Sequence, residues 1–142
     1  MARKRMSKKC EKEAMEDPEE AYNYARDVIK GRWCQVELLF ITCPSLAYYY
    51  AYDVIKGRWP EAEPFIMKSP AWAYNYARDV VKGRWYQAEP YILDNIMNSL
   101  HQYSVYRYAR DIIGGRWPEA EPHIMKVQYF WKQYNDFLST LR

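Results

Sequence analysis

Small apolar residues recur along this chain at the spacing of one helix face. Ala47, Ala51, Val54 and Ile55 follow one another at intervals of four, three and one residues, which places them on a single stripe of an α-helix. Pro44 precedes the stripe and suits the first position of a helix, where the missing N–H would be unpaired anyway. The same pattern begins again at three other places: Ala21, Ala73 and Val105.

A second, shorter apolar stripe follows each of these helices. In the second copy Ala62, Ile66 and Met67 share one helix face. Pro60 suits the first turn of this helix, but Pro64 would cost about 3 kcal/mol in a helix interior, so the helix is short, bent or begins near that residue. Each copy therefore predicts an antiparallel pair, with about 13 residues in the first helix and about 9 in the second.

The segment between the paired helices is repeated almost unchanged. It reads KGRWCQVEL, KGRWPEAEP, KGRWYQAEP and GGRWPEAEP in its four copies, at spacings of 26, 26 and 32 residues. We expect Gly57 to end its helix in the left-handed conformation that glycine tolerates. A fixed period of this size is typical of tandem repeats, whose units bury their apolar faces against their neighbours.

The sequence therefore predicts an all-α fold, a right-handed α-solenoid of four antiparallel helix pairs with a C-terminal capping helix. Asp17 and Ser69 are good N-cap residues and mark where two of the units begin. An apolar stripe from Val127 to Leu141 predicts the capping helix. The expected divisions are a basic flexible arm at 1–16, helical at most in part, then repeats at about 17–42, 43–68, 69–100 and 101–126, and a cap at 127–142.

Composition favours one cytoplasmic domain. Of the 142 residues, 49% are hydrophobic and 18% aromatic, which is too apolar for a disordered chain. No run of about 18 uncharged apolar residues occurs, and the basic N-terminus lacks the apolar core of a signal peptide. We therefore expect no membrane association. Cys10, Cys34 and Cys43 form no Cys-x-x-Cys pair, so we expect them to be reduced thiols.

Positive charge is concentrated at the N-terminus. Residues 1–12 hold six basic groups and one acidic group, a local charge of +5, whereas the rest of the chain carries −2. Attraction to nucleic acid is therefore a property of the arm rather than of the repeats. The residues that would contact phosphate are Arg3, Lys4, Arg5, Lys8 and Lys9.

The repeated motif resembles a known kind of sequence. Assembled across the units, Asp-Pro-x-x-Ala-Tyr-x-Tyr-Ala-Arg-Asp-Val-Ile-Lys-Gly-Arg-Trp-Pro-Glu-Ala-Glu-Pro is similar to short bihelical repeats in predicted proteins of large bacteriophages, and more distantly to the Sel1-like and tetratricopeptide solenoids. The resemblance covers about residues 17–126. It implies a binding surface on a phage-encoded protein of the host cytoplasm, for instance an inhibitor of a bacterial defence protein or a virion assembly component.

Residues that return in every unit are explained first by folding. Asp53 and Glu63 lie five residues before and after Arg58, and each unit repeats this arrangement. Paired carboxylates can act as acid and base, but four equivalent copies beside arginine favour structural links. We expect each motif tryptophan to cover the gap between units, with its indole N–H on a helix-end carbonyl. Because no phosphate loop, nucleophile elbow or metal-ligand spacing occurs, we expect no catalysis, no cofactor and no metal.

Two tyrosines recur in each first helix, as Tyr74 and Tyr76 do, on faces about 200° apart. Two alternatives are open. One set is exposed beside arginines such as Arg78, a composition typical of protein-binding hot spots, or both sets are buried because a repeat helix has neighbours on two sides.

A partner that binds the repeat array at one position only must contact residues that differ between the units. The longest departure is the insertion DNIMNSLHQYSV from Asp94 to Val105, and insertions in repeat arrays often lie on the binding face. A simpler explanation extends the second helix through Ile92, Ile96 and Leu100. The predicted partner-binding residues are Tyr103, Tyr106, Arg107, His101, His123, Tyr74 and Arg78.

These patterns predict a non-catalytic helical-repeat module that binds another protein of host or viral origin. The alternative is nucleic-acid or nucleotide binding through the basic arm and the Lys-Gly-Arg turns. Salt would discriminate between the two, because phosphate binding weakens steeply as salt rises.

Overall fold

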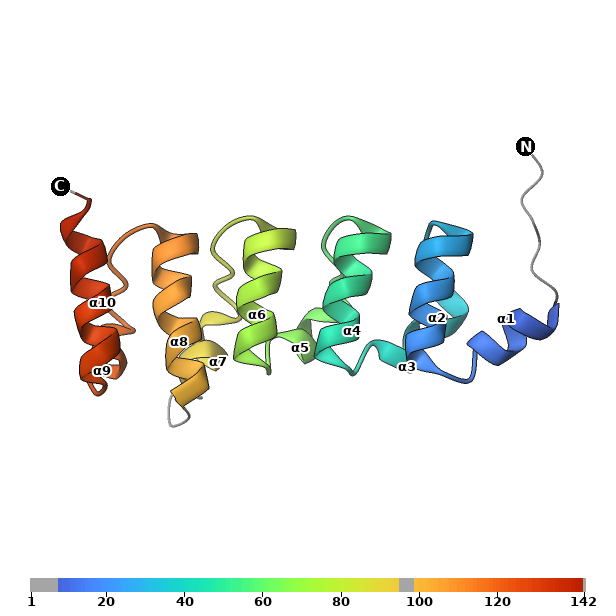
Figure 1. The fold of residues 1–142 in the computed structure, drawn as a ribbon, viewed down its shortest axis with the longest axis horizontal. Coiled ribbons are helices and arrows are strands. Elements are labelled where there is room, and N and C mark those ends of the chain that lie inside the picture. The colour runs from blue at the N-terminus through green and yellow to red at the C-terminus, as the bar shows by residue number, and fades with distance from the viewer. Residues whose placement is uncertain (1–7, 95–98, 142) are drawn as a thin grey trace.

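The computed structural model describes residues 8–94 and 99–141, with side chains at 11–94 and 103–141. Every regular element in these ranges is a helix, which confirms the predicted all-α class. The helices lie in two rows that run side by side from the N-terminal to the C-terminal end of the molecule (Figure 1).

The longer helices form one row, and we call them the first helices. They are α2 (Pro18–Tyr24), α4 (Pro44–Tyr49), α6 (Pro70–Tyr76), α8 (Ser99–Tyr108) and α10 (Gln128–Ser139). All but α10 continue into a π-helical end, a turn with i to i+5 hydrogen bonds. These ends are η1 (Ala25–Ile29), η3 (Tyr50–Ile55), η4 (Ala77–Val81) and η5 (Ala109–Ile113).

Of the two predicted N-caps, Asp17 accepts hydrogen bonds from the backbone N–H groups of Glu19 and Glu20, at 2.9 and 3.0 Å. Ser69 occupies the N-cap position of α6, but its side chain makes no capping bond.

The short second helices form the other row. They are α1 (Lys8–Ala14), α3 (Glu37–Phe40), α5 (Glu63–Ile66), α7 (Glu89–Asp94) and α9 (Glu121–Ile124), and a 3₁₀ turn, η2 (Cys34–Val36), leads into α3. The expected length of about 9 residues is wrong for α5, which has 4. It begins at Glu63 rather than Pro60, and this places Pro64 in its first turn, where no backbone donor is lost.

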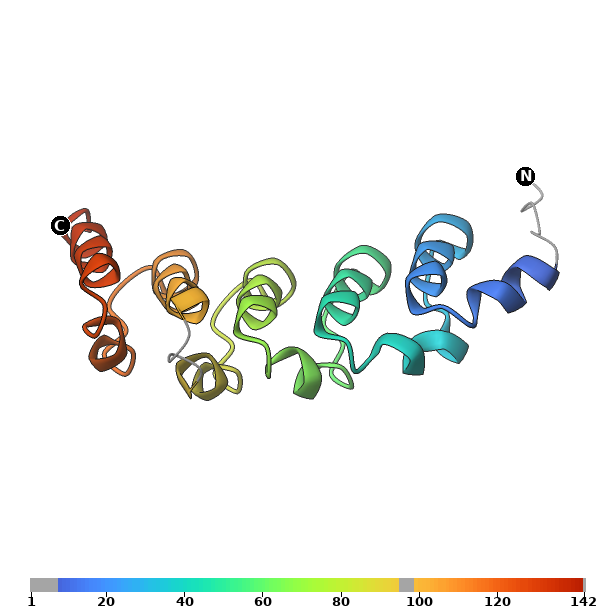
Figure 2. The ribbon, with the colours of Figure 1, turned by 60° about the horizontal axis from the view of Figure 1, so that its bottom comes forward.

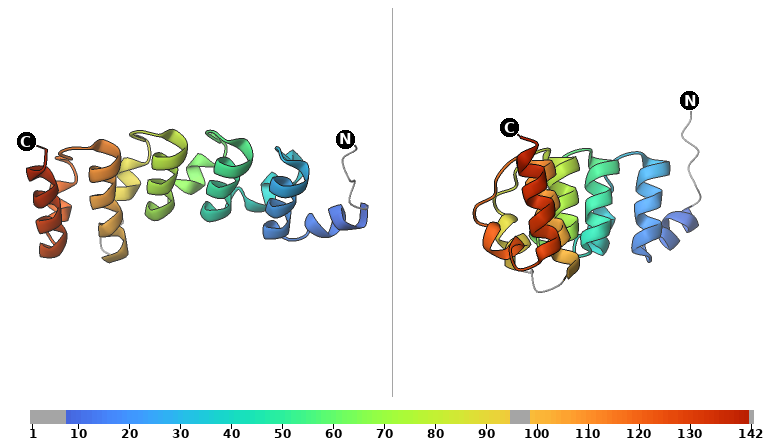
Figure 3. Two further views of the ribbon diagram at one scale, coloured as in Figure 1. Left: turned by 45° about the horizontal axis from the view of Figure 1, so that its top comes forward. Right: turned by 60° about the vertical axis from the view of Figure 1, so that its left-hand side comes forward.

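The two rows form a shallow arc with the first helices on its inner side and the second helices on its outer side (Figure 2). The first helices stay nearly parallel from one unit to the next (Figure 3). A unit is a first helix with the second helix that follows it, so units 1 to 4 begin with α2, α4, α6 and α8. A lone second helix, α1, precedes unit 1, and a lone first helix, α10, follows unit 4.

The first helix of each of units 1 to 4 ends at a residue in the left-handed conformation. This residue is not the glycine that we expected but the one immediately before it. Lys30, Lys56 and Lys82 have φ of 57°, 58° and 59°, and Gly114 takes the same place in unit 4 with φ of 69°. Gly57 does not have positive φ, so its predicted role as the left-handed cap is wrong. The π-helical end is the reason, because the Ala51 carbonyl accepts the N–H groups of both Lys56 and Gly57 and the chain turns one residue earlier.

Small residues bring the rows together. The paired alanines of the first helices, such as Ala73 and Ala77, are fully buried in one core with side chains of the second helices. The packed side chains between the rows include Ile66, Ile92 and the ring of Trp85. This packing is the physical reason that one unit does not stand alone.

The insertion is divided between two helices. Helix α7 ends at Asp94, and α8 begins at Ser99 and includes Leu100, while Ile96 lies outside the described residues. The expected extension of the second helix through Leu100 is therefore wrong. Leu100 has helical spacing to Ser104 and Tyr108 as well as to Ile96, so spacing alone does not decide which helix contains it.

Candidate functional site

A tyrosine from each of units 2 to 4, and one from α10, closes the turn of the unit before it. The Tyr76 hydroxyl accepts a hydrogen bond from the backbone N–H of Trp59 at 2.7 Å and donates one to Glu63 at 2.9 Å. Glu63 also receives two hydrogen bonds from Arg58, at 2.7 and 2.8 Å. The same link is made by Tyr50, Tyr108 and, from α10, Tyr134.

A second link joins neighbouring first helices. The hydroxyl of Tyr48 donates to Asp79 at 2.7 Å, and that of Tyr74 donates to Asp111 at 2.6 Å. Arg78 holds Asp79 with two further bonds of 2.7 Å and lowers the pKa of this carboxyl group, although partial burial opposes the shift. The recurring carboxylates are thus occupied by structural partners, as the repetition indicated.

Both sets of recurring tyrosines are buried, which decides between the two alternatives. Tyr74 is 3% exposed and Tyr106 is 7% exposed, and Tyr76 and Tyr108 are fully buried. The alternative of an exposed set is wrong, because a first helix inside the row, such as α6, packs against a first helix on either side. Tyr74 and Tyr106 therefore offer a partner little of their ring surface.

The motif tryptophans pack against the core, and the ring of Trp59 lies 6.1 Å from that of Phe40 in the unit before it, but Trp85 and Trp117 do not use their indole donors as expected. The rings of Trp85 and Trp117 lie 4.9 Å from those of Tyr76 and Tyr108. Among the described side chains, these two indole N–H groups are buried without an acceptor. The tyrosine hydroxyl, rather than the indole, makes the polar link, through the tryptophan backbone N–H.

Side chains that differ from unit to unit gather on the inner side of the arc. Three positions of each first helix, at spacings of four and three residues, form one stripe opposite the buried alanines. We call this stripe the inner face. From unit 1 to α10 it consists of Glu19, Asn23 and Arg26; Ser45, Tyr49 and Tyr52; Ala71, Asn75 and Arg78; Tyr103, Arg107 and Arg110; and Tyr129, Gln133 and Asp136, none of them buried.

Three of the predicted partner-binding residues lie on this face, and a fourth, the buried Tyr74, lies directly beside them. The guanidinium carbon of Arg107 lies 4.8 Å from the ring centroid of Tyr74 and 5.1 Å from that of Tyr103. Arg78 lies 5.1 Å from the same Tyr74 ring and donates a long hydrogen bond to its hydroxyl. Tyr103 is 47% exposed. We call Tyr74, Arg78, Tyr103 and Arg107 the tyrosine–arginine cluster.

The other predicted residues lie elsewhere. The ring of Tyr106 lies beside Arg110, at 5.3 Å from its guanidinium carbon. His123 belongs to α9 in the outer row and is half-buried. His101 belongs to α8, but its side chain lies outside the described residues.

The residues expected to contact phosphate are placed only in part. Arg3, Lys4 and Arg5 lie outside the described residues, and Lys8 and Lys9 belong to α1 with side chains that are not described. The turn arginines are described, and each donates two hydrogen bonds to a glutamate five residues later: Arg32, Arg58, Arg84 and Arg116. Phosphate at these turns would have to displace the glutamates.

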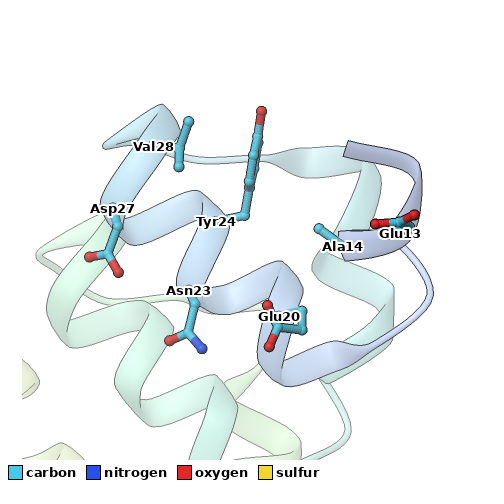
Figure 4. Close-up of a pocket in the computed structure, with 7 residues that line it drawn as sticks. All are labelled: Glu13, Ala14, Glu20, Asn23, Tyr24, Asp27 and Val28. Carbon is cyan, nitrogen blue, oxygen red and sulfur yellow. The ribbon is translucent and has the colours of Figure 1, made fainter. Parts of the chain in front are cut away.

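A pocket of about 420 Å³ lies between α1 and α2 (Figure 4). Glu20 and Asn23 of α2 and Asp27 of η1 line it, and Glu13 and Ala14 lie on the helix beside them (Figure 4). Within the described part of the chain, no three carboxylate, thiol or imidazole groups are close enough together to hold a metal ion. The pocket marks the end of the row, where α2 has no first helix before it.

Sequence reasoning missed an aromatic group on units 2 and 3. The Trp72 ring lies 5.4 Å from the ring of Tyr48 and 5.6 Å from that of Tyr49, and Tyr52 stacks on Tyr48 at 6.0 Å. Tyr49 and Tyr52 are 42% and 50% exposed. The sequence does contain a sign of this group, because Tyr49 and Tyr52 stand at inner-face positions where unit 1 has Asn23 and Arg26.

Comparison of the chain with protein-family models, with curated proteins and with solved structures finds no match. None of the helices at 8–94 and 99–141 has the length and apolar character needed to cross a membrane.

Proposed function

We propose that the chain is a non-catalytic, right-handed α-solenoid that binds another protein through its inner face. One observation carries the proposal: the residues that hold the units together recur, whereas the inner-face residues change between acidic, basic, polar and aromatic types. Folding requires the recurring residues in every unit. The changing residues give each unit a different contact surface. A partner that binds at one position along the row needs such a difference.

The composition of the inner face supports a protein partner. Tyr49, Tyr52 and Tyr103 are exposed there, and tyrosine and arginine are enriched in the residues that dominate protein–protein binding energies. The face is not a uniform cationic surface, because Arg26, Arg78 and Arg110 are each paired with the next residue, an aspartate. This favours a protein over the phosphate backbone of a nucleic acid.

The outer row is the other surface on which a partner could bind. It also varies, as Leu39 and His123 show at equivalent positions, and large side chains are exposed on it or on the turns that lead to it, such as Leu38 of α3 and Tyr86 before α7. Both surfaces therefore offer apolar area, and the proposal assigns binding to the inner one.

Two matched triple variants test this assignment. The inner variant carries Tyr49→Ser, Tyr52→Ser and Tyr103→Ser, and the outer variant carries Leu38→Ser, Tyr86→Ser and Met125→Ser. The full chain is used to capture proteins from a bacterial lysate, which follows from the resemblance to phage repeats, and partners are identified by mass spectrometry. We expect the inner variant to lose a partner that the outer variant retains, with circular dichroism showing both folded.

Loss of the partner by the outer variant alone would overturn the assignment. Recovery of nucleic acid instead of protein, with binding that falls steeply between 50 and 200 mM salt, would favour the alternative function.

A further inference from the structure

Arg107 differs from every other arginine in the described part of the chain. Seven described arginines donate two hydrogen bonds each to a carboxylate: Arg26, Arg32, Arg58, Arg78, Arg84, Arg110 and Arg116. Arg107 donates none. Its nearest carboxylate oxygen, on Asp111, lies 3.8 Å from Nε, and that Nε is buried without a hydrogen-bond partner.

Asp111 accepts no hydrogen bond from Arg107, because other groups already donate to both of its carboxylate oxygens. Arg110 donates to its two oxygens at 2.6 and 3.0 Å, and the Tyr74 hydroxyl donates to Oδ2 at 2.6 Å. These bonds lower the pKa of Asp111, with that from Arg110 having the largest effect, so the carboxylate stays ionised and fully engaged. The guanidinium of Arg107 is therefore left with donors that no carboxylate of the described chain satisfies.

Two tyrosine rings hold this guanidinium in place. It lies within about 5 Å of the ring centroids of Tyr74 and Tyr103, which is the range of a cation–π contact. The Tyr74 ring is itself fixed by its bond to Asp111 and by burial. The Arg107 side chain remains 32% exposed. A planar fork of N–H donors is thus held with part of its edge open on the inner face.

We propose that Arg107 is the anchor for a carboxylate of the protein partner, an aspartate or glutamate side chain that docks beside Tyr103. This inference rests on the proposed function. The guanidinium fork matches the two oxygens of a carboxylate, and such charge-assisted pairs are the strongest hydrogen bonds that proteins make. The residue is also specific to one register, since Asn23, Tyr49 and Asn75 stand at this position in the other units.

Charge favours a carboxylate over a phosphate group. Among the described side chains around Tyr74, Arg78 is balanced by Asp79 and Arg110 by Asp111, which leaves Arg107, 3.8 Å from the shared Asp111, as the one positive charge without a carboxylate of its own. One carboxylate neutralises it, whereas a phosphate monoester, with a charge of about −1.5 to −2 at pH 7, would leave an excess negative charge beside two aspartates. The exposed rings of Tyr103 and Tyr129 offer contact to an apolar residue next to the acidic one.

The direct test is a titration of the ¹⁵N-labelled full chain, observed at the arginine Nε–Hε resonances. The probes are sodium acetate, sodium methyl phosphate and sodium chloride at equal ionic strength. We expect acetate to shift the Arg107 resonance saturably and to leave Arg26, an arginine of the same face that is already paired, nearly unmoved. Equal responses to acetate and chloride, or tighter binding of methyl phosphate than of acetate, would overturn the inference.

A random-peptide display library, selected on the immobilised full chain, tests the same site with peptides. Wild type should enrich peptides that contain Asp or Glu beside an apolar residue, and Arg107→Gln should lose the acidic preference and bind those peptides about tenfold more weakly. Arg26→Gln is the matched control and should behave as wild type. Arg107→Lys keeps the charge without the fork and should recover only part of the binding.

The two proposals fail in different ways. Enriched peptides with no acidic preference, lost by the inner triple variant, would support the proposed function and overturn the role of Arg107. If neither wild type nor the outer triple variant enriches any peptide, the proposed function is contradicted, and the acetate titration still decides whether Arg107 binds a carboxylate.

Discussion

The hydroxyl of Tyr76 accepts a hydrogen bond of 2.7 Å from the backbone N–H of Trp59, which belongs to the unit before it. Because Trp59 is 1% exposed and Tyr76 is fully buried, water does not replace this bond when the hydroxyl is removed. The junction between units therefore depends on one phenolic oxygen that both accepts from the backbone and donates to Glu63.

We expect Tyr76→Phe to lower the free energy of unfolding by about 2 kcal/mol, because it leaves a buried N–H unsatisfied. Urea denaturation followed by circular dichroism measures the change. The control is Tyr52→Phe, since Tyr52 is 50% exposed, and its effect should stay within about 0.5 kcal/mol. Equal effects of the two substitutions would show that the hydroxyl link contributes nothing.

The left-handed helix ends provide a second prediction. A non-glycine residue at positive φ is strained by about 1 kcal/mol, and Lys56 has φ of 58°. We expect Lys56→Gly to raise the unfolding free energy by up to about 1 kcal/mol after the greater flexibility of glycine in the unfolded chain is subtracted. Gly114→Lys should lower it by a similar amount.

Gly57→Ala is the control for this pair. Gly57 does not have positive φ, and a Cβ atom there would meet no atom within 4 Å, so the substitution should be tolerated. A larger loss from Gly57→Ala than from Gly114→Ala, measured by thermal melting, would contradict the assignment of the left-handed residue.

The sequence predicted the helix pairs because their apolar residues repeat at helical spacing, and it separated recurring from changing residues without a structure. The π-helical ends were not predictable, since a turn with one extra residue leaves the apolar stripe nearly intact and moves the left-handed residue only from Gly57 to Lys56. The burial of both tyrosine sets depends on neighbours on two sides, which the pattern of one helix does not report. Tyr103 and Arg107 were found as departures from the repeat, but their contact with Tyr74 required the relative placement of α6 and α8.

Stability should depend on pH at both extremes. Arginine partners hold the pKa values of Asp79 and Asp111 below the usual range, so their contribution is complete above the unfolded pKa, about 4, and is lost as pH falls through the lower folded value. Burial raises the pKa of Tyr76 and Tyr108 above the ordinary value of 10, so their contribution is complete below pH 10 and is lost as pH rises further.

Urea midpoints measured from pH 3 to pH 11 should therefore form a plateau between about pH 5 and 9 with a decline on each side. Tyr76→Phe should reduce the decline on the alkaline side and leave the acidic side unchanged. An alkaline decline of the same size in this variant would assign the effect to other groups.

Removal of residues 1–12 should leave the repeats folded, because units 1 to 4 and α10 keep their links. The truncation removes Glu11, which accepts a hydrogen bond of 3.3 Å from the Tyr24 hydroxyl, so we expect a loss of about 1 kcal/mol that is concentrated in unit 1. Hydrogen exchange should show faster exchange in α2 than in α6. Unfolding of the whole chain would show that α1 belongs to the core, and any affinity for nucleic acid should fall sharply in the truncated chain.

The competition for Asp111 supplies the last prediction. Arg110 occupies Asp111 and thereby keeps it from Arg107, so Arg110→Gln should let Asp111 turn to Arg107 and weaken the saturable acetate shift several-fold. A simple loss of positive charge would also weaken anion binding, and Arg78→Gln measures that contribution, because it removes an equal charge beside the Tyr74 ring and frees Asp79 instead. If competition operates, Arg110→Gln weakens acetate binding clearly more than Arg78→Gln does, and the difference persists in 0.5 M sodium chloride, where the Debye length is only about 4 Å. Equal losses of acetate affinity in the two variants would mean that binding at Arg107 depends on the total positive charge of the inner face and not on competition for Asp111.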